Sequence, residues 1–256
     1  MNKVNNKRLI NTKALVGASL LTAISIVLTR MLSIMIPLAG LPALRIEFGM
    51  IPLIIAGILY GPLWGGLAGI IADLIGVMIN PMGAYFPGFT ISSMLWGALP
   101  GVLYLLVKRN NFKINYNIIN GVALTGIATC IVVVLFDNKV LAVKDGTYYM
   151  YDKPMPMIYA ILYISIVAAL ILIPFVMTRK DKAKRDLYSI DKIAFIVTVS
   201  YVIISLVLNT FWLSIMYNKG FIAFLPGRIL ASLIMIPLHT TIVYTLSKSF
   251  KYVKAR

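Results

Sequence analysis

The side chains of this sequence with the clearest binding chemistry lie near the ends of apolar stretches. Arg228 closely follows Pro226, a residue type that favours the start of a helix. A guanidinium in the first turn of a helix favours an anion such as a carboxylate. Arg45 follows Pro42 near the end of another apolar stretch and adds a second cation. An arginine that snorkels to lipid headgroups explains the position of Arg228 equally well.

An amide and a tryptophan share one face of a predicted helix in the stretch NTFWLS. Asn209 and Trp212 are three residues apart, which places them on the same side of a helix. An amide inside an apolar helix needs a hydrogen-bond partner. We therefore expect Asn209 to bind the edge of a planar ligand and Trp212 to stack on its ring.

The loop NPMGAYFPGFT, residues 80–90, presents aromatic rings between helix-breaking residues. Its prolines and glycines forbid a continuous helix. Tyr85 and Phe86 supply flat surface for a planar ligand, although an aromatic belt at the membrane interface has the same composition. The predicted ligand-binding set is Arg45, Tyr85, Phe86, Asn209, Trp212 and Arg228.

Arg30 and Asp73 are charged residues inside apolar segments, each about seven residues from the outer end of its segment. A lone charge at membrane depth costs about 2.5–3.5 kcal/mol on insertion scales. We hypothesise that the two residues form an ion pair. Its role is either structural or in ligand binding.

Groups for catalysis or metal binding are scarce in this sequence. It has one cysteine, Cys130, and one histidine, His239, and it lacks the G-x-x-x-x-G-K-[ST] loop that binds nucleotides. We therefore expect no enzyme activity, no ATPase site, no metal and no cofactor.

The elements that must position these residues are long and apolar. Hydrophobic residues make up 60% of the chain and charged residues 12%, against about 25% charged in soluble domains. A bilayer core requires about 20 apolar residues per helix. Eight segments meet or approach that length: 14–38, 47–60, 62–80, 90–107, 117–136, 157–178, 193–217 and 225–247. The predicted fold class is an all-α integral membrane protein with about eight transmembrane helices.

The basic residues predict how the chain is oriented in the lipid bilayer. The net charge is +16, but the basic residues lie in short loops, so we expect no nucleic-acid partner. One side carries 17 Lys and Arg residues and the other carries 6. The positive-inside rule then places both termini in the cytoplasm.

The stretch from Leu44 to Thr90 resembles the substrate-binding S components of energy-coupling factor (ECF) transporters. The matching pieces are LRIEFGMIPLIIAGILYGPLWGGLAGIIADLIG and GAYFPGFT, and NTFWLS and LPGRI indicate the folate-type branch. The resemblance covers about residues 12–109 and 191–247. It implies a high-affinity vitamin-binding subunit, preferably for folate, in a bacterial-type plasma membrane.

The same resemblance implies a partner module of one coupling membrane subunit and two ATP-binding cassette ATPases. In this family small residues of the first helix contact the coupling subunit, and Ala14 and Ala18 match their spacing. S components usually have six helices, so we interpret residues of about 114–180 as an inserted helical pair within a single membrane domain, 1–256. The alternatives are a self-sufficient secondary transporter of a small organic solute and, with least support, a membrane enzyme.

Overall fold

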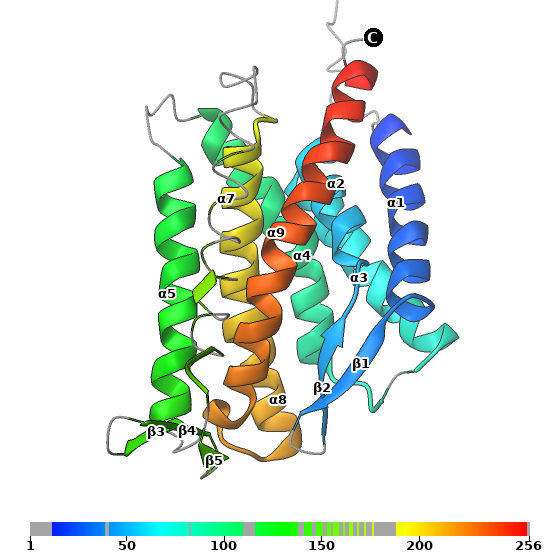
Figure 1. The fold of residues 1–256 in the computed structure, drawn as a ribbon. Coiled ribbons are helices and arrows are strands. Elements are labelled where there is room, and N and C mark those ends of the chain that lie inside the picture. The colour runs from blue at the N-terminus through cyan, green and yellow to red at the C-terminus, as the bar shows by residue number, and fades with distance from the viewer. Residues whose placement is uncertain are drawn as a thin grey trace, which may run out of the picture. The chain divides into compact units, whose positions relative to one another are not determined.

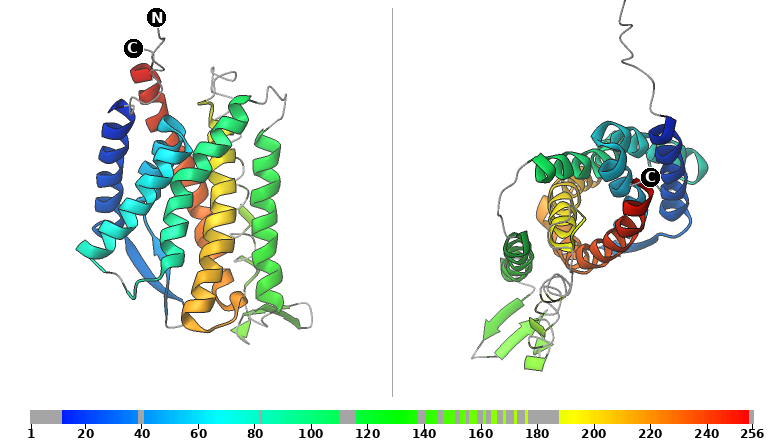
Figure 2. Two further views of the ribbon diagram at one scale, coloured as in Figure 1. Left: turned by 180° about the vertical axis from the view of Figure 1, so that it is seen from behind. Right: turned by 90° about the horizontal axis from the view of Figure 1, so that it is seen from above.

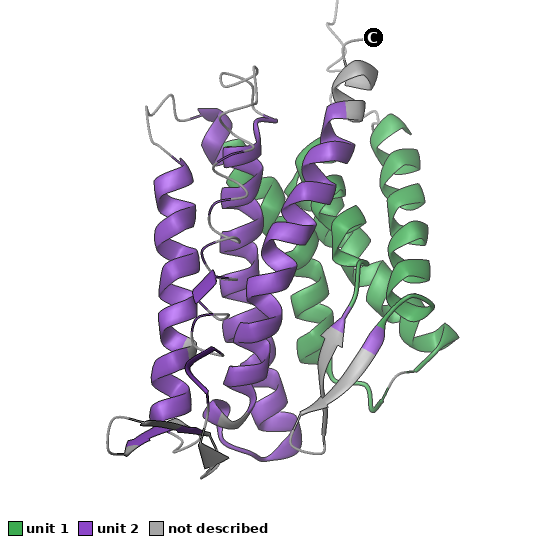
Figure 3. Ribbon diagram, viewed as in Figure 1, with its two compact units in different colours: residues 1–33, 47–105 green, residues 34–46, 106–256 purple. Residues whose placement is uncertain are grey.

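The computed structural model describes residues 12–38, 41–81, 83–109, 116–137, 141–144, 147–150 and 188–254, with isolated positions between 153 and 176. Helices dominate the described residues, as the apolar segments predict (Figure 1). The chain forms two compact units, each described here by itself (Figure 3). Unit 1 comprises residues 1–33 and 47–105, and unit 2 comprises residues 34–46 and 106–256.

Unit 1 is a group of apolar helices. It contains α1 (Thr12–Arg30), α2 (Met50–Tyr60), α3 (Pro62–Ile79) and most of α4 (Pro87–Arg109). The first three of these helices pack against one another. Gly61 separates α2 from α3 with φ +96°, a left-handed conformation that favours glycine, and Pro62 then starts α3.

Glycines bring α4 into backbone contact with α2 and α3. A Cβ added to Gly57 or Gly65 would overlap the carbonyl oxygen of Gly97 on α4. A Cβ added to Gly69 would overlap the carbonyl of Ser93 in the same way. The four-residue spacing of these glycines predicts this close approach, because small residues on one face let transmembrane helices meet.

The first apolar segment ends as a helix earlier than predicted. α1 stops at Arg30, and an antiparallel hairpin of β1 (Ile34–Leu38) and β2 (Leu41–Ile46) follows. The prediction of a helix over 14–38 was wrong at its end. Pro37 has no N–H for a helical hydrogen bond, and the isoleucines beside it favour a strand.

Unit 2 contains the later helices and the small sheets. α5 (Tyr116–Asp137), α7 (Ile190–Ser200) and α9 (Phe221–Lys254) lie side by side (Figure 2). After α5 the chain forms an antiparallel sheet of β3 (Leu141–Lys144), β4 (Thr147–Met150) and β5 (Lys153–Pro154).

The helix that begins as α7 changes its winding before it ends. It continues through η1 (Tyr201–Leu208), a π-helix, into α8 (Asn209–Tyr217). The N–H of Asn209 donates to the carbonyl of Ile204, five residues back, where an α-helix would use the carbonyl four residues back. The predicted helix over 193–217 is therefore present, but with a π-helical segment that apolar content alone does not indicate.

The last helix begins before its predicted start. α9 starts at Phe221, so Pro226 lies inside it and Arg228 lies beyond its first turn. The prediction that Pro226 opens this helix was wrong. Phe224 is 1% exposed, and its ring contacts the ring of Tyr217. This packing stabilises a helical turn before Pro226, although the proline has no N–H and one helical hydrogen bond is missing there. The helix dipole therefore adds little to anion binding at Arg228, because its effect fades after the first turn.

Six helical stretches within the described residues are long and apolar enough to cross a bilayer. α2, with 11 residues, is shorter than that length. The predicted helix over 157–178 lies mostly outside the described residues, although at its described positions the chain is helical, and Ser165 Oγ donates to the carbonyl of Ile161 at 2.7 Å. The all-α membrane class is confirmed, and the total of about eight helices remains a prediction.

Candidate ligand-binding site

Arg228 is held against η1 by two hydrogen bonds within unit 2. Its Nε donates to the carbonyl of Ser205 at 3.1 Å, and its Nη2 donates to Ser205 Oγ at 3.3 Å. The residue is partly buried. A guanidinium fixed on one side to a neighbouring helix has a set orientation, which a side chain snorkelling freely to headgroups lacks.

Asn209 and Trp212 lie one and two turns beyond Ser205, in α8. Asn209 Oδ1 is buried and accepts no hydrogen bond from any residue that the structure describes. A buried polar atom left without a partner costs about 1–3 kcal/mol, which a donor on a ligand would recover. The ring of Trp212 lies 5.2 Å from that of Phe211, at an angle of 54°.

Arg45 lies on β2, where its backbone pairs with Met35 of β1. The side chain of Arg45 falls outside the described part of the chain. β2 packs against α9, the helix that carries Arg228. Within unit 2, the strand that carries Arg45 therefore contacts the helix that carries Arg228.

The aromatic loop before α4 is anchored within unit 1 by Thr90. Thr90 Oγ1 donates to Asp73 Oδ2 at 2.7 Å, and the hydroxyl of Tyr85 lies 3.0 Å from the same Oγ1. Because Thr90 has one hydroxyl proton and gives it to the carboxylate, Tyr85 must donate to Thr90. Tyr85 remains 49% exposed, and Phe86 packs edge to face on Phe89 at 5.9 Å. The loop is therefore fixed while half of the tyrosine surface stays open.

Arg30 extends this network between α1 and α3. Its Nη2 lies 3.4 Å from Asp73 Oδ1, and its Nη1 donates to the carbonyl of Asn80 at 3.1 Å. Asn80 Nδ2 donates back to the carbonyl of Arg30 at 3.2 Å. Arg30 is the last residue of α1, not a residue seven positions inside its end, whereas Asp73 lies inside α3, six residues before Ile79. The hypothesised pair therefore joins the end of α1 to the interior of α3. A ligand role for Arg30 and Asp73 remains a prediction.

Three residues of these clusters were missed by sequence reasoning, namely Thr90, Asn80 and Ser205. Ser205 precedes Asn209 by one helical turn and is polar within an apolar run, which was an available signal. Its contact with Arg228 spans 23 residues, and the contact of Thr90 with Asp73 spans 17. Spacing alone does not reveal such pairs.

Ala14 and Ala18 are buried, with 3% and 5% of their surfaces exposed. A partner could reach them only after the chain rearranges. The exposed residues of α1 include the larger apolar side chains of Val16 and Leu20, at 63% and 62%. Docking of Ala14 and Ala18 on a coupling subunit remains a prediction.

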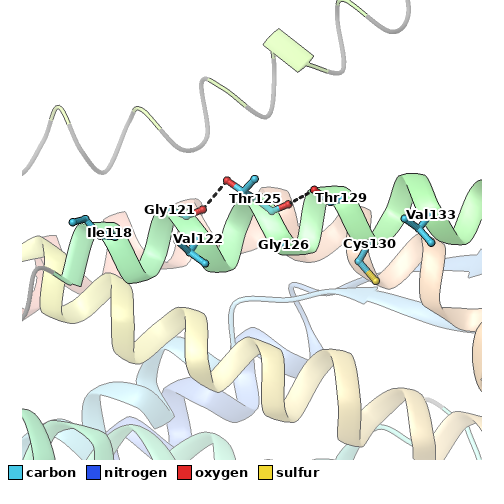
Figure 4. Close-up of a pocket in the computed structure, with 8 residues that line it drawn as sticks. All are labelled: Ile118, Gly121, Val122, Thr125, Gly126, Thr129, Cys130 and Val133. Atoms are coloured by element: carbon cyan, nitrogen blue, oxygen red, sulfur yellow. Dashed lines mark hydrogen bonds between the residues drawn. The ribbon is translucent and has the colours of Figure 1, made fainter.

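A shallow groove along α5 is lined by none of the predicted site residues (Figure 4). It is lined by Ile118, Gly121, Val122, Thr125, Gly126, Thr129, Cys130 and Val133. Its two threonine hydroxyls donate to carbonyls of their own helix, at 2.8 and 2.9 Å. The groove is therefore apolar and suits hydrocarbon better than a charged ligand. Within the described ranges, no three His, Cys, Asp or Glu residues come together in a group that could hold a metal.

The protein class follows from a family comparison. The model of the family "ECF transporter, substrate-specific component" matches residues 13–178, which is more than half of the chain. The chain belongs to this family of multi-pass membrane transport subunits, and the predicted resemblance is confirmed. The match includes α5 and continues to residue 178, so the interpretation of 114–180 as an insertion remains a prediction.

One relative is similar to part of this chain in sequence, and one solved structure is similar to it in fold. The folate transporter FolT of Clostridium novyi (strain NT) is 41% identical over 81 residues, which are 32% of this chain and 44% of that protein. The chain thus spans less than half the length of the curated relative that it matches. The solved structure described as the crystal structure of FolT bound with folic acid has a TM-score of 0.54, with 20% identity, over 94% of this chain and 95% of that one. This second likeness is one of fold.

Proposed function

We propose that this protein is the folate-binding S component of an ECF-type importer. The observation that carries the choice of folate is the 41% identity with a protein named as a folate transporter. The chemistry of the unit 2 residues supports the same choice, because folates combine a flat heterocycle with two carboxylates. Arg228 and Arg45 offer cations, Trp212 offers a ring, and Asn209 offers a buried acceptor.

In this proposal each group of residues has a separate task. Asn209 Oδ1 accepts a hydrogen bond from an N–H of the heterocycle, and Trp212 stacks on its face. Arg228 and Arg45 bind the glutamate carboxylates. Tyr85 and Phe86 remain predicted contacts of the flat ring, by virtue of the aromatic surface that they offer.

The proposed transport step requires partners. The sequence has no G-x-x-x-x-G-K-[ST] loop, so we propose that a coupling membrane subunit and two ATP-binding cassette ATPases supply the energy. Both termini lie in the cytoplasm in this proposal, supported by the excess of Lys and Arg on their side. The ligand is then captured at the outer face.

Folic acid binding to the purified chain tests the proposal. Arg228→Ala should weaken the affinity about tenfold or more, because hydrogen bonds to charged groups contribute about 1.5–3 kcal/mol. Titration of tryptophan fluorescence measures this affinity. Arg109→Ala, at the exposed end of α4, is the matched control and should bind as the native protein does. Absence of folic acid binding by the native protein would refute the proposal.

Reconstitution separates this function from a secondary transporter. The isolated chain in liposomes should bind folic acid but accumulate none under an imposed proton or sodium gradient. Gradient-driven uptake by the chain alone would favour the secondary transporter.

A further inference from the structure

The π-helical segment η1 singles out one residue beside the proposed ligand site. Long π-helical segments are rare, and π-turns occur frequently at functional sites because they displace side chains and backbone from the α-helical pattern. η1 has eight residues and ends where Asn209 begins α8. Ser205, the residue of η1 that contacts Arg228, lies one turn before Asn209.

Ser205 of η1 offers two acceptors to Arg228. Its carbonyl accepts from Nε at 3.1 Å and its Oγ accepts from Nη2 at 3.3 Å, so both bonds are on one edge of the guanidinium. Two bonds on one edge hold the plane of the group more firmly than one bond does. Thr210 Oγ1 also donates to the Ser205 carbonyl, at 3.5 Å, from the first turn of α8. Ser205 thus links the guanidinium of α9 to the start of α8.

We infer that Ser205 is a positioning residue, whose hydroxyl orients the Arg228 guanidinium toward a carboxylate of the ligand. This inference rests on the proposed function. Removal of the hydroxyl leaves the carbonyl bond in place, so the arginine stays beside η1, but it deletes one of the two bonds on this edge and holds the plane of the guanidinium less firmly. The loss should therefore affect the recognition of carboxylates and leave the recognition of the heterocycle unchanged.

Paired ligands of nearly equal size make this distinction. The two carboxylates of folic acid are uncharged esters in its dimethyl ester, while the heterocycle is the same. Ser205→Ala should weaken folic acid binding about tenfold, since a hydrogen bond to a charged group is lost. It should change the affinity for the dimethyl ester less than twofold. Ser205→Thr, which keeps a hydroxyl, should restore most of the preference for folic acid.

Ser200→Ala is the matched control on the same continuous helix. The Oγ of Ser200 donates to the carbonyl of Ile196 at 2.8 Å, so its removal deletes a buried hydroxyl away from Arg228. This variant should bind both ligands as the native protein does. Should Ser205→Ala fail to fold, Arg228→Lys serves instead, because an ammonium keeps the charge but cannot make the two bonds on one edge.

The results separate the inference from the proposed function. Native protein that does not bind folic acid refutes both. Native binding with an unchanged affinity in Ser205→Ala refutes the role of Ser205 alone. Equal losses for folic acid and its dimethyl ester would also overturn that role, because they indicate a general disturbance of the site. A selective loss of folic acid binding, rescued by Ser205→Thr, supports it.

Discussion

At the scale of single residues, Arg30 shows how one guanidinium can join two helix ends. It is 8% exposed, and its acceptors include the carboxylate of Asp73 and the carbonyl of Asn80. A further bond of 3.4 Å goes from Nη2 to the carbonyl of Asp73. A carboxylate placed at position 30 would be repelled by these carbonyls. Exchange of Arg30 and Asp73 is therefore a poor test of the pair, and a substitution that keeps the charge is better.

Arg30→Lys should lower the free energy of unfolding by about 1.5–3 kcal/mol, because one ammonium cannot reproduce the planar set of hydrogen bonds to charged and backbone groups. Thermal melting in detergent, followed by intrinsic fluorescence, measures the change. Arg109→Lys, at the exposed end of α4, is the control and should melt with the native protein. Equal melting temperatures for Arg30→Lys and the native chain would show that charge alone is sufficient.

At the scale of helices, backbone contact between α3 and α4 depends on the absence of side chains. The atoms that a Cβ on Gly65 would meet belong to the backbone of Gly97 and Gly57 and cannot turn aside as a flexible side chain does. Gly65→Ala should therefore prevent close packing and lower the yield of folded protein or its melting temperature sharply. Size-exclusion chromatography and thermal melting measure both quantities.

The control for this prediction is a glycine in an α-helix with open space beside it. A Cβ on Gly126 of α5 would meet no atom within 4 Å. Gly126→Ala should leave the melting temperature unchanged or raise it slightly, because alanine favours a helix over glycine by about 0.5–1 kcal/mol. If Gly65→Ala and Gly126→Ala behave alike, α3 and α4 are not in backbone contact.

Apolar length was enough to predict helices such as α3, α4 and α5, since lipid requires each crossing to be apolar whatever its neighbours are. It was not enough to place the end of α1 or the start of α9, where Pro37 and Pro226 had opposite effects. A proline forces an exit from a helix only when no packed turn beside it offsets the lost hydrogen bond. Such compensation depends on tertiary contacts that neighbouring residues do not reveal.

Sequence reasoning proposed the types of residue in the candidate site but not the hydrogen bonds between them. Asn209 and Trp212 follow from helical spacing, and the aromatic loop follows from its prolines and glycines. The hydrogen bonds from Arg228 to Ser205 and from Thr90 to Asp73 depend on which helices meet. Those meetings are decided by small residues and by the winding of η1, which hydrophobic patterns do not specify.

At the scale of the whole molecule, the chain belongs to a family of membrane transport subunits. The central question is therefore on which side of the membrane each loop lies. The excess of basic residues predicts that the end of α4 is cytoplasmic and that the sheet after α5 is external. α5 connects these two regions and is apolar over 22 residues. Its exposed residue Cys130 lies inside that helix and is the single cysteine of the chain, so thiol chemistry can report on both depth and orientation.

We expect Cys130 to react with a lipid-soluble maleimide and to resist a charged, membrane-impermeant one, because hydrocarbon excludes the charged reagent. In a Cys130→Ala background, Val143→Cys on β3 should react with the charged reagent in intact cells, since Val143 is 53% exposed. Lys108→Cys, in the last turn of α4 on the predicted cytoplasmic side, should react only after the membrane is permeabilised. Mass shifts on gels measure the labelling. A reversed pattern for positions 143 and 108 would invert the proposed topology, and it would place the sheet on the side from which a captured vitamin cannot arrive.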